Sequence, residues 1–177
     1  GEVQHSCARP GARVLDLACG TGGYSIALAA RGFSVIGTDL DSAMITLARE
    51  KGAGSSAEFR VMDMLEIGRR LAPGFGLIFC IGNSIVHLES EAKIAQVLAD
   101  CHRLLAPGGN LVVQIINYDR ILGEHITELP TLRNEERGLE FIRTYDYDRE
   151  SRVVQFRTEL RVREKDGLRK VRNCVPL

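Results

Sequence analysis

Hydrophobic and polar positions along the chain follow two different periods. Short apolar runs rich in β-branched residues predict strands, and apolar positions spaced three and four apart predict helices. Strands are expected at 13–18, 34–38, 58–62, 75–81 and 111–116, and helices at 24–31, 42–51 and 91–105. This alternation is typical of an α/β fold, in which a doubly wound, mostly parallel sheet lies between helices.

The last of these helices and the strand after it are expected to be deeply packed. One face of the helix carries a row of apolar residues that should point at the sheet; they are Ile94, Val97, Leu98, Cys101 and Leu105. The sequence Pro107-Gly108-Gly109 ends the helix. The strand 111–116 is apolar at nearly every position, which predicts that both of its faces are covered.

After Tyr118 the pattern changes to a period of two. Alternating residues at 141–148, 152–163 and 168–175 predict an antiparallel β meander, with a hairpin turn at Asp166-Gly167. The chain is thus expected to comprise a core over residues 1–120 and an extension over 121–177 within the same domain. Because the extension follows the last parallel strand, we expect it to act as a lid over the ligand-binding edge. Its mildly basic charge fits a solvated face as well as an anionic partner.

Composition and charge exclude several classes of function. The 177 residues hold 23 basic and 23 acidic side chains, so no overall field favours nucleic acid as a partner. No apolar run reaches the roughly 18–20 residues that span a bilayer, and the amino end does not resemble a signal peptide. A cytoplasmic protein without a membrane partner is expected.

The cysteine and histidine content predicts neither disulfides nor a metal site. The five cysteines are scattered and contain no CxxC pair, so we interpret them as reduced, small hydrophobic residues. The four histidines form no cluster with metal-ligand spacing. No metal is therefore expected.

Residues 14–25, VLDLACGTGGYS, place three glycines between the first strand and the first helix. Glycines allow positive φ angles and let a ligand approach the backbone. The place of the third glycine in the dinucleotide pattern GxGxxG is taken by Ser25, which disfavours a pyrophosphate ligand. Asp16 lies inside the strand, where a buried carboxylate needs a partner. A ligand ammonium group would supply one, and the amides of the glycine loop are the structural alternative.

Acidic residues also follow the second and third strands. Asp39 follows Gly20 by about 20 residues, the distance at which an acid accepts ribose hydroxyls, whereas Asp41 is better suited to cap the next helix. Asp63 could accept the exocyclic amino group of an adenine, with Leu40 and Met64 covering the ring. The pattern therefore indicates adenosine that carries an amino acid.

Four motifs in order resemble those of the class I S-adenosylmethionine-dependent methyltransferases, which have a Rossmann-like core. They are VLDLACGTGG, VIGTDLD, VMDM and LLAPGGNLVV, and the resemblance covers roughly residues 12–120. It implies S-adenosylmethionine as cofactor and S-adenosylhomocysteine as product. It also implies that Asp16 and the backbone of the glycine loop hold the methionine part. The implied cofactor-binding residues are Asp16, Cys19, Gly20, Gly22, Asp39, Leu40, Asp63, Met64, Cys80 and Ile81.

Two further stretches, GNSIVHL at 82–88 and NYDRIL at 117–122, are similar to segments of glycine and sarcosine N-methyltransferases. This similarity implies a small-molecule acceptor that is methylated at an amine nitrogen. Asn117 and Tyr118 become candidates to contact the acceptor, and Asn83 and His87 become candidates to line its pocket. His87, Tyr118 or Asp119 could take up the amine proton, although solvent could also do so. The structural alternatives are a hydrogen-bonded His87 and a turn shaped by Asn117 and Tyr118.

The sequence also departs from the family pattern at both ends. The helix that normally precedes the first motif and the final strand pair of the sheet are not recognised, so we expect an incomplete chain. The resemblance leaves open whether the protein forms homo-oligomers. Two other functions stay open: an NAD(P)-dependent oxidoreductase, which the missing third glycine disfavours, and a methyltransferase-like binding protein without turnover.

Overall fold

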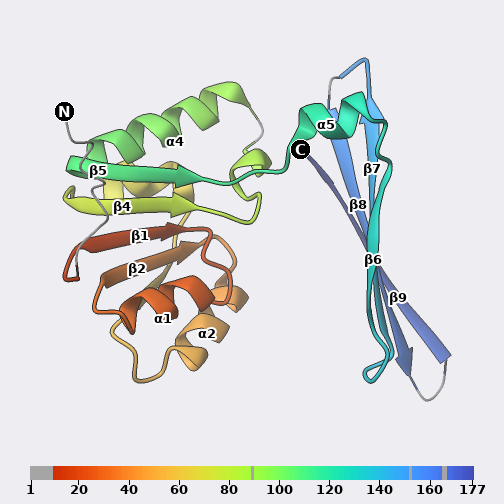
Figure 1. Cartoon of the computed structure of the whole chain (residues 1–177), viewed down its shortest axis with the longest axis horizontal. Helices are drawn as coiled ribbons and strands as arrows, with labels where there is room; N and C mark the ends of the chain where they lie inside the picture. The colour runs from red at the N-terminus through yellow and green to blue at the C-terminus, as the bar shows by residue number, and fades with distance from the viewer. Residues whose placement is uncertain (1–9, 89, 152, 165–166) are drawn as a thin grey trace, which may run out of the picture. The chain divides into compact units, whose positions relative to one another are not determined.

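A computed structural model of the chain describes residues 10–88, 90–151, 153–164 and 167–177. The chain divides into two compact units, residues 1–115 and 116–177 (Figure 1). None of the described helices combines the length and apolarity needed to cross a membrane. Cys19, Cys80, Cys101 and Cys174 are free thiols, of which Cys174 is exposed, and Cys7 lies outside the described residues.

The first unit is built on a five-stranded sheet in the order β3-β2-β1-β4-β5, and all of its strand pairs are parallel. The strands are β1 (Arg13–Leu17), β2 (Ser34–Asp39), β3 (Glu58–Val61), β4 (Phe75–Cys80) and β5 (Leu105–Val113). The chain reverses direction across the sheet at β1, which pairs with β2 on one side and β4 on the other. Ligands of doubly wound sheets bind at the carboxyl ends of strands beside such a reversal. The predicted α/β class is confirmed.

Helices cover both faces of this sheet (Figure 1). They are α1 (Gly23–Ala29), α2 (Ser42–Lys51), α3 (Ile67–Arg70) and α4 (Glu91–Leu104), with the 3₁₀ helices η1 (Met64–Glu66) and η2 (Ile85–His87). Alternate residues of β1 point to opposite faces. Leu15 and Leu17 pack into the cluster that contains Val97 and Cys101 of α4, whereas Val14 packs with Ala29 of α1.

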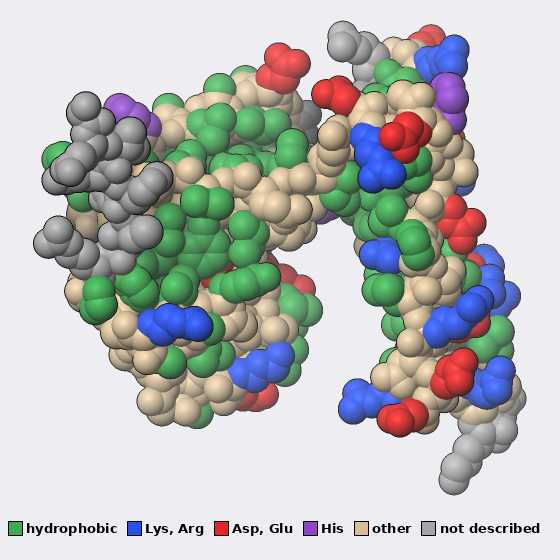
Figure 2. All heavy atoms as spheres, viewed as in Figure 1, with side chains coloured by type: hydrophobic (Ala, Val, Ile, Leu, Met, Phe, Trp, Pro, Cys, Tyr) green, Lys and Arg blue, Asp and Glu red, His purple; other side chains and the backbone are tan. Residues whose placement is uncertain are grey.

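Strand β5 is less buried than its apolar sequence predicts. Among the described strands it pairs only with β4 and forms the edge of the sheet, and Val112 and Val113 keep 47% and 39% of their surface exposed. Hydrophobic side chains therefore reach the surface of this unit (Figure 2). The expectation that both faces of the strand are covered is wrong, because composition alone does not reveal which strand lies at an edge. The strand ends at Val113, three residues before Ile116, where the sequence predicted its end.

The inward face of α4 is also narrower than predicted. Val97, Cys101 and Leu104 are buried, but Leu98 is 38% exposed. The helix ends at Leu104, and Leu105 already pairs with Phe75 as the first residue of β5. The register between β4 and β5 shifts between Phe75 and Leu77. On β5, the residues opposite this shift include Gly108 and Gly109, which were expected to end the helix.

The second unit is a four-stranded antiparallel sheet in the order β6-β7-β8-β9. Its elements are α5 (Tyr118–Gly123), β6 (Glu128–Asn134), β7 (Leu139–Asp148), β8 (Val153–Glu164) and β9 (Gly167–Pro176). The predicted meander is confirmed, whereas α5 and β6 were not predicted. Of the predicted hairpin turn, Asp166 lies outside the described residues, and Gly167 opens β9 with a φ of 139°.

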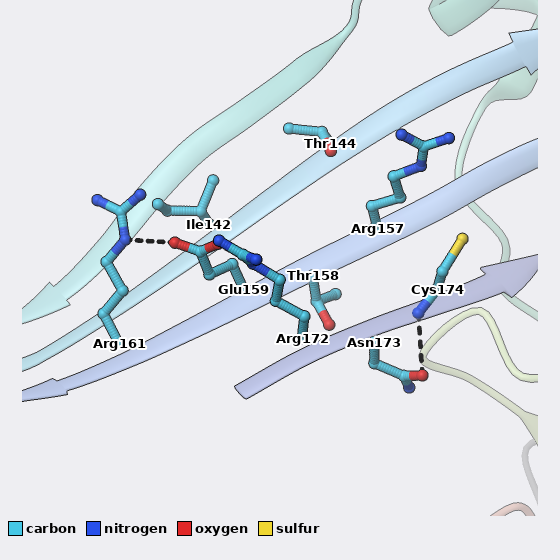
Figure 3. A pocket seen from close by; sticks show the side chains of 9 residues that line it. All are labelled: Ile142, Thr144, Arg157, Thr158, Glu159, Arg161, Arg172, Asn173 and Cys174. Atoms are coloured by element: carbon cyan, nitrogen blue, oxygen red, sulfur yellow. Dashed lines mark hydrogen bonds and ion pairs between the residues drawn. The ribbon is translucent and has the colours of Figure 1, made fainter. Parts of the chain in front are cut away.

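The charged side chains of the second unit lie interspersed over its surface (Figure 2). On one face of the sheet, Glu140 pairs with Arg133 and Arg161, and Glu159 pairs with Arg161 and Arg172. This face carries a cavity of about 500 Å³ (Figure 3). It is lined by Ile142, Thr144, Arg157, Thr158, Glu159, Arg161, Arg172, Asn173 and Cys174. These ion pairs engage part of the charge of this face, and the basic excess noted in the sequence is not explained by them.

Candidate functional site: the glycine loop and the adjoining cavity

The glycine loop connects β1 to α1 and contains several left-handed backbone conformations. Gly20 and Gly22 have φ angles of 54° and 77°, and Ala18, which carries a Cβ atom, has a φ of 58°. Left-handed conformations at residues other than glycine cost energy and cluster at functional sites. Gly22 caps α1 without any side-chain hydrogen bond. The sequence identified the glycines but not the unusual backbone of Ala18.

The carboxylate of Asp39 holds the loop from the end of β2. Its Oδ2 accepts a hydrogen bond from the N–H of Gly20 at 2.8 Å, and its Oδ1 accepts one from the N–H of Asp41 at 2.9 Å. Asp41 caps α2 as predicted, because its side chain accepts from the N–H of Ala43 at 2.7 Å. Asp39 is thus fixed at the sheet edge, where its contact with ribose stays a prediction.

The buried partner of Asp16 is Ser25. Asp16 is 2% exposed, and the Ser25 hydroxyl donates a hydrogen bond to its Oδ2 at 2.7 Å. Burial raises the pKa of Asp16 to about 6, the Ser25 hydrogen bond opposes this rise, and the charge of Asp39 adds to it. Ser25 occupies the position of the missing third glycine. Asp16 and Ser25, which the sequence analysis singled out for separate reasons, therefore contact each other, and the sequence did not reveal this.

The backbone N–H groups of Cys19, Gly20 and Gly22, three residues predicted to hold the methionine part through their backbone, have partners within the fold. The N–H of Cys19 donates to the carbonyl of Thr38 at 2.9 Å, and that of Gly22 donates to the carbonyl of Cys19 at 3.0 Å. The N–H of Gly20 is engaged by Asp39. These amide hydrogens are therefore engaged within the fold, and contact of this backbone with the methionine part stays a prediction. Such internal bonds depend on the loop conformation and leave no trace in the sequence.

A cavity of about 360 Å³ opens at the ends of β2 and β3. It is lined by Ala18, Thr38, Asp39, Leu40, Met62, Asp63, Met64, Leu65, Ser84, His87, Leu88 and Lys93. The structure thus brings together five residues singled out from the sequence: Asp39, Leu40, Asp63, Met64 and His87. The other seven were missed, although Thr38, Met62 and Leu65 directly adjoin predicted residues.

The cavity has the chemical character of a nucleoside site. Asp39 and Asp63 contribute carboxylates at the tips of neighbouring strands, and Leu40 and Met64 contribute apolar surface. The Oδ1 of Asp63 accepts a hydrogen bond from the N–H of Leu65 at 2.9 Å, which fixes the side chain at the start of η1. Leu40 is 71% exposed. A few oriented polar groups within a mainly apolar lining are typical of small-molecule sites, so these residues fit an adenosine.

Two residues expected beside the methyl donor, Cys80 and Ile81, are not part of the lining of this cavity, and their place beside the donor stays a prediction. Cys80 is 1% exposed and belongs to the hydrophobic core under α4, and burial raises the pKa of its thiol to about 11. Ile81 packs against the cluster that includes Val14 and Phe79. Neither lines the cavity. The position of Cys80 at the end of a strand did not reveal that its side chain points into the core.

The thiol of Cys19 lies near the carboxylates of Asp16 and Asp39. Burial raises its pKa to about 12, and the negative charges of Asp16 and Asp39 contribute to this rise. A thiol with so high a pKa stays protonated at neutral pH and is a poor nucleophile. Cys19 is therefore not suited to covalent chemistry.

The residues predicted to contact the acceptor lie in different elements. His87 ends η2 and lines the cavity, and Asn83, with a φ of 69°, precedes it in a loop tied to Gln114 by hydrogen bonds. Asn117 and Tyr118 belong to the second unit. The side chain of Asn117 caps α5 by accepting from the N–H of Arg120 at 3.0 Å. This bond supports the structural interpretation of Asn117, and its contact with an acceptor stays a prediction.

Comparison with known families decides the affiliation of the first unit. A family model described as a methyltransferase domain matches residues 14–109, which include the glycine loop and both cavity acids. The chain belongs to this methyltransferase family. The resemblance to class I S-adenosylmethionine-dependent methyltransferases is therefore confirmed.

Two relatives of the methyltransferase domain differ in the acceptor that their names imply. A glycine/sarcosine N-methyltransferase of Aphanothece halophytica is 36% identical over 114 residues, which cover 63% of this chain and 43% of the relative. A ubiquinone biosynthesis O-methyltransferase of Hahella chejuensis is 34% identical over 117 residues, covering 65% and 48%. The chain thus spans less than half the length of these relatives.

A solved structure extends the similarity into the second unit. The methyltransferase domain and its extension align with the S-adenosylmethionine-bound CalS10 of Micromonospora echinaspora, described as an amino pentose methyltransferase. The TM-score is 0.75 at 28% identity, and the alignment covers 94% of this chain and 68% of that one. The arrangement of a parallel core followed by an antiparallel sheet therefore occurs in another methyltransferase.

Proposed function

We propose that this protein binds S-adenosylmethionine in the cavity at the ends of β2 and β3 and methylates an amine nitrogen of a small molecule. The observation that carries the proposal is that Asp39 and Asp63 both line one cavity of about 360 Å³. In the proposed complex, Asp39 accepts hydrogen bonds from the ribose hydroxyls. Asp63 accepts one from the adenine amino group, and Leu40 and Met64 contact the ring.

The proposed chemistry depends mainly on position. When bound, S-adenosylmethionine supplies a methyl group on a sulfonium, which an attacking amine takes up by in-line displacement while the S–C electron pair stays on sulfur. The residues of this chain hold the reactants in place, which alone can lower a barrier by several kcal/mol. A neutral amine loses a proton in the reaction. His87 lines the cavity and is a candidate to receive it, with solvent as the alternative.

A nitrogen acceptor is favoured by the names of the relatives. The glycine/sarcosine N-methyltransferase is 36% identical, and the amino pentose methyltransferase shares 28% of its residues and both parts of the fold. The O-methyltransferase relative, at 34% identity, makes an oxygen acceptor the second candidate. The role of the second unit as a lid, and that of Asn117 and Tyr118 at the acceptor, are part of the same proposal.

Calorimetry and an acceptor screen test the proposal. The chain is titrated with S-adenosylmethionine, S-adenosylhomocysteine and NAD, and is then incubated with labelled S-adenosylmethionine and glycine, sarcosine, amino sugars or phenols. We expect both sulfur nucleosides to bind and label to appear on an amine. Binding of NAD alone would favour an oxidoreductase. Binding of S-adenosylmethionine without any product would favour a methyltransferase-like protein without turnover.

A further inference from the structure

Three consecutive residues of the glycine loop are each contacted by a different element of the fold. Asp39 at the end of β2 binds the N–H of Gly20. Lys51, the last residue of α2, donates from its Nζ to the Thr21 hydroxyl at 2.9 Å. Phe59 of β3 packs against Gly22. We propose that Phe59 and Lys51 are positioning residues that fix the cofactor loop, an inference that rests on the proposed function.

Three glycine backbones lie so close to the ring of Phe59 that none of them leaves room for a Cβ atom. A Cβ atom on Gly22 would lie 2.6 Å from its Cε1 and Cζ atoms. A Cβ atom on Gly37 or Gly52 would lie 2.9 Å from its Cδ1 or Cε2 atom. Real Cβ atoms do not approach other atoms so closely, so the ring and the three glycine backbones are in tight contact. The ring therefore limits where the backbone of Gly22 can lie.

Phe59 is itself held rigidly. It is 5% exposed and packs in a cluster with Ile45 and Ala48 of α2. Its carbonyl accepts two hydrogen bonds from Arg49, from Nε at 3.2 Å and from Nη2 at 2.8 Å. A side chain fixed in this way transmits the position of β3 to the loop.

Lys51 contacts the same loop from the carboxyl end of α2. The first turn of this helix is capped by Asp41, whose N–H bonds to Asp39, and its last residue reaches Thr21. A loop that already has its bound conformation loses less conformational entropy when a ligand binds. Phe59 and Lys51 are thus expected to raise cofactor affinity without contacting the cofactor.

The first test compares two buried phenylalanines. Phe59→Leu removes the ring beneath Gly22, whereas Phe75→Leu removes a ring that is 0% exposed and packs in the core cluster under α4. We expect Phe59→Leu to weaken S-adenosylhomocysteine binding by about tenfold and Phe75→Leu by less than about twofold. Both variants should lose stability. Equal effects on affinity would overturn a positioning role for Phe59.

The second test uses an exposed residue, so that folding is preserved. Lys51→Met should weaken binding by about threefold, and Lys51→Arg should restore most of the affinity. The matched control is Arg31→Met, since the Arg31 guanidinium bonds to the carbonyl of Ala27 within its own helix region. Adding Thr21→Val to Lys51→Met should cause little further loss. Wild-type affinity in Lys51→Met would remove Lys51 from the proposal.

Amide hydrogen exchange without ligand separates this inference from the proposed function. In Phe59→Leu and Lys51→Met, exchange at residues 20–23 should accelerate more than exchange in β1 and β4. If the loop amides respond in this way but wild-type protein does not bind S-adenosylhomocysteine, the positioning contact is real and the proposed function fails. If wild-type protein binds and neither the loop exchange nor the affinity changes in the variants, the inference fails alone.

Discussion

The Oδ2 atom of Asp39 accepts a hydrogen bond from the N–H of Gly20 at 2.8 Å, which joins the end of β2 to the glycine loop. An acid expected to bind ribose therefore also shapes the backbone beside it. We predict that Asp39→Ala weakens S-adenosylmethionine binding by at least about tenfold. Calorimetry measures the loss, with Asp41→Ala as the control. That variant should lose about 1 kcal/mol of stability with its helix cap and keep its affinity. Unchanged affinity in Asp39→Ala would remove this acid from the site.

His87 provides a contrasting prediction. It lines the cavity at the end of η2, but no step of cofactor recognition is assigned to its imidazole. His87→Ala should leave S-adenosylmethionine affinity within about twofold of wild type. If His87 receives the amine proton, the turnover of this variant should fall although its cofactor affinity does not. A tenfold loss of cofactor affinity would instead make His87 a direct cofactor contact.

Neighbouring glycines of the loop should respond oppositely to the same substitution. Gly22 has a φ of 77°, and an added Cβ would lie 2.6 Å from the Phe59 ring, whereas Gly23 has open space around it and begins α1. Gly22→Ala should cost about 1–3 kcal/mol of stability and lower cofactor affinity. Gly23→Ala should be neutral or slightly stabilising, because alanine favours the helix. Thermal unfolding and calorimetry measure the pair. Similar losses in both variants would contradict the left-handed conformation of Gly22 and its contact with Phe59.

The stability of the first unit should depend on pH through Asp16. Its pKa is raised to about 6 in the folded chain by burial, from an unfolded value of 3.8. The folded state therefore binds the proton more tightly, and the stability contributed by the protonated acid is lost as pH rises from about 4 to about 6. Asp16→Asn removes this titration while keeping an oxygen that can accept from Ser25. Urea unfolding should show the variant to be more stable than wild type above pH 6, by up to about 3 kcal/mol, with the gain disappearing towards pH 4.

A pH effect of the opposite sign is expected in the second unit. Hydrogen bonds from Arg172 and Arg161 lower the pKa of Glu159 to about 2, from 4.5. A lowered pKa contributes stability that is present above about pH 4.5 and is lost as pH falls towards 2. Glu159→Gln should reduce the protection of β8 and β9 against hydrogen exchange at pH 6. The variant should also lose less of its remaining protection at low pH than wild type does. Glu140→Gln is a matched control, since Glu140 forms longer ion pairs, at 3.2 and 3.4 Å.

The sequence by itself determined the order of the elements and the approximate place of the site. The switch between periods near residue 118 predicted a parallel core and an antiparallel sheet, because backbone geometry fixes the side-chain period of each element. The acids at the carboxyl ends of β2 and β3 could be assigned to one side of the sheet, since parallel strands end on the same side. The cap role of Asp41 followed from its place before an apolar helix. These features depend on neighbours in the sequence.

The elements α5 and β6 escaped prediction because α5, with six residues, completes fewer than two helical turns and β6 contains Pro130, which is untypical of a strand interior. Only the tertiary structure decided which groups meet across long separations. It paired Ser25 with Asp16, engaged the amides of Cys19, Gly20 and Gly22 within the fold, turned Cys80 into the core and left β5 at an edge. Each of these outcomes depends on where distant segments pack. Side-chain direction and hydrogen-bond partners are fixed only when the sheet and its helices come together.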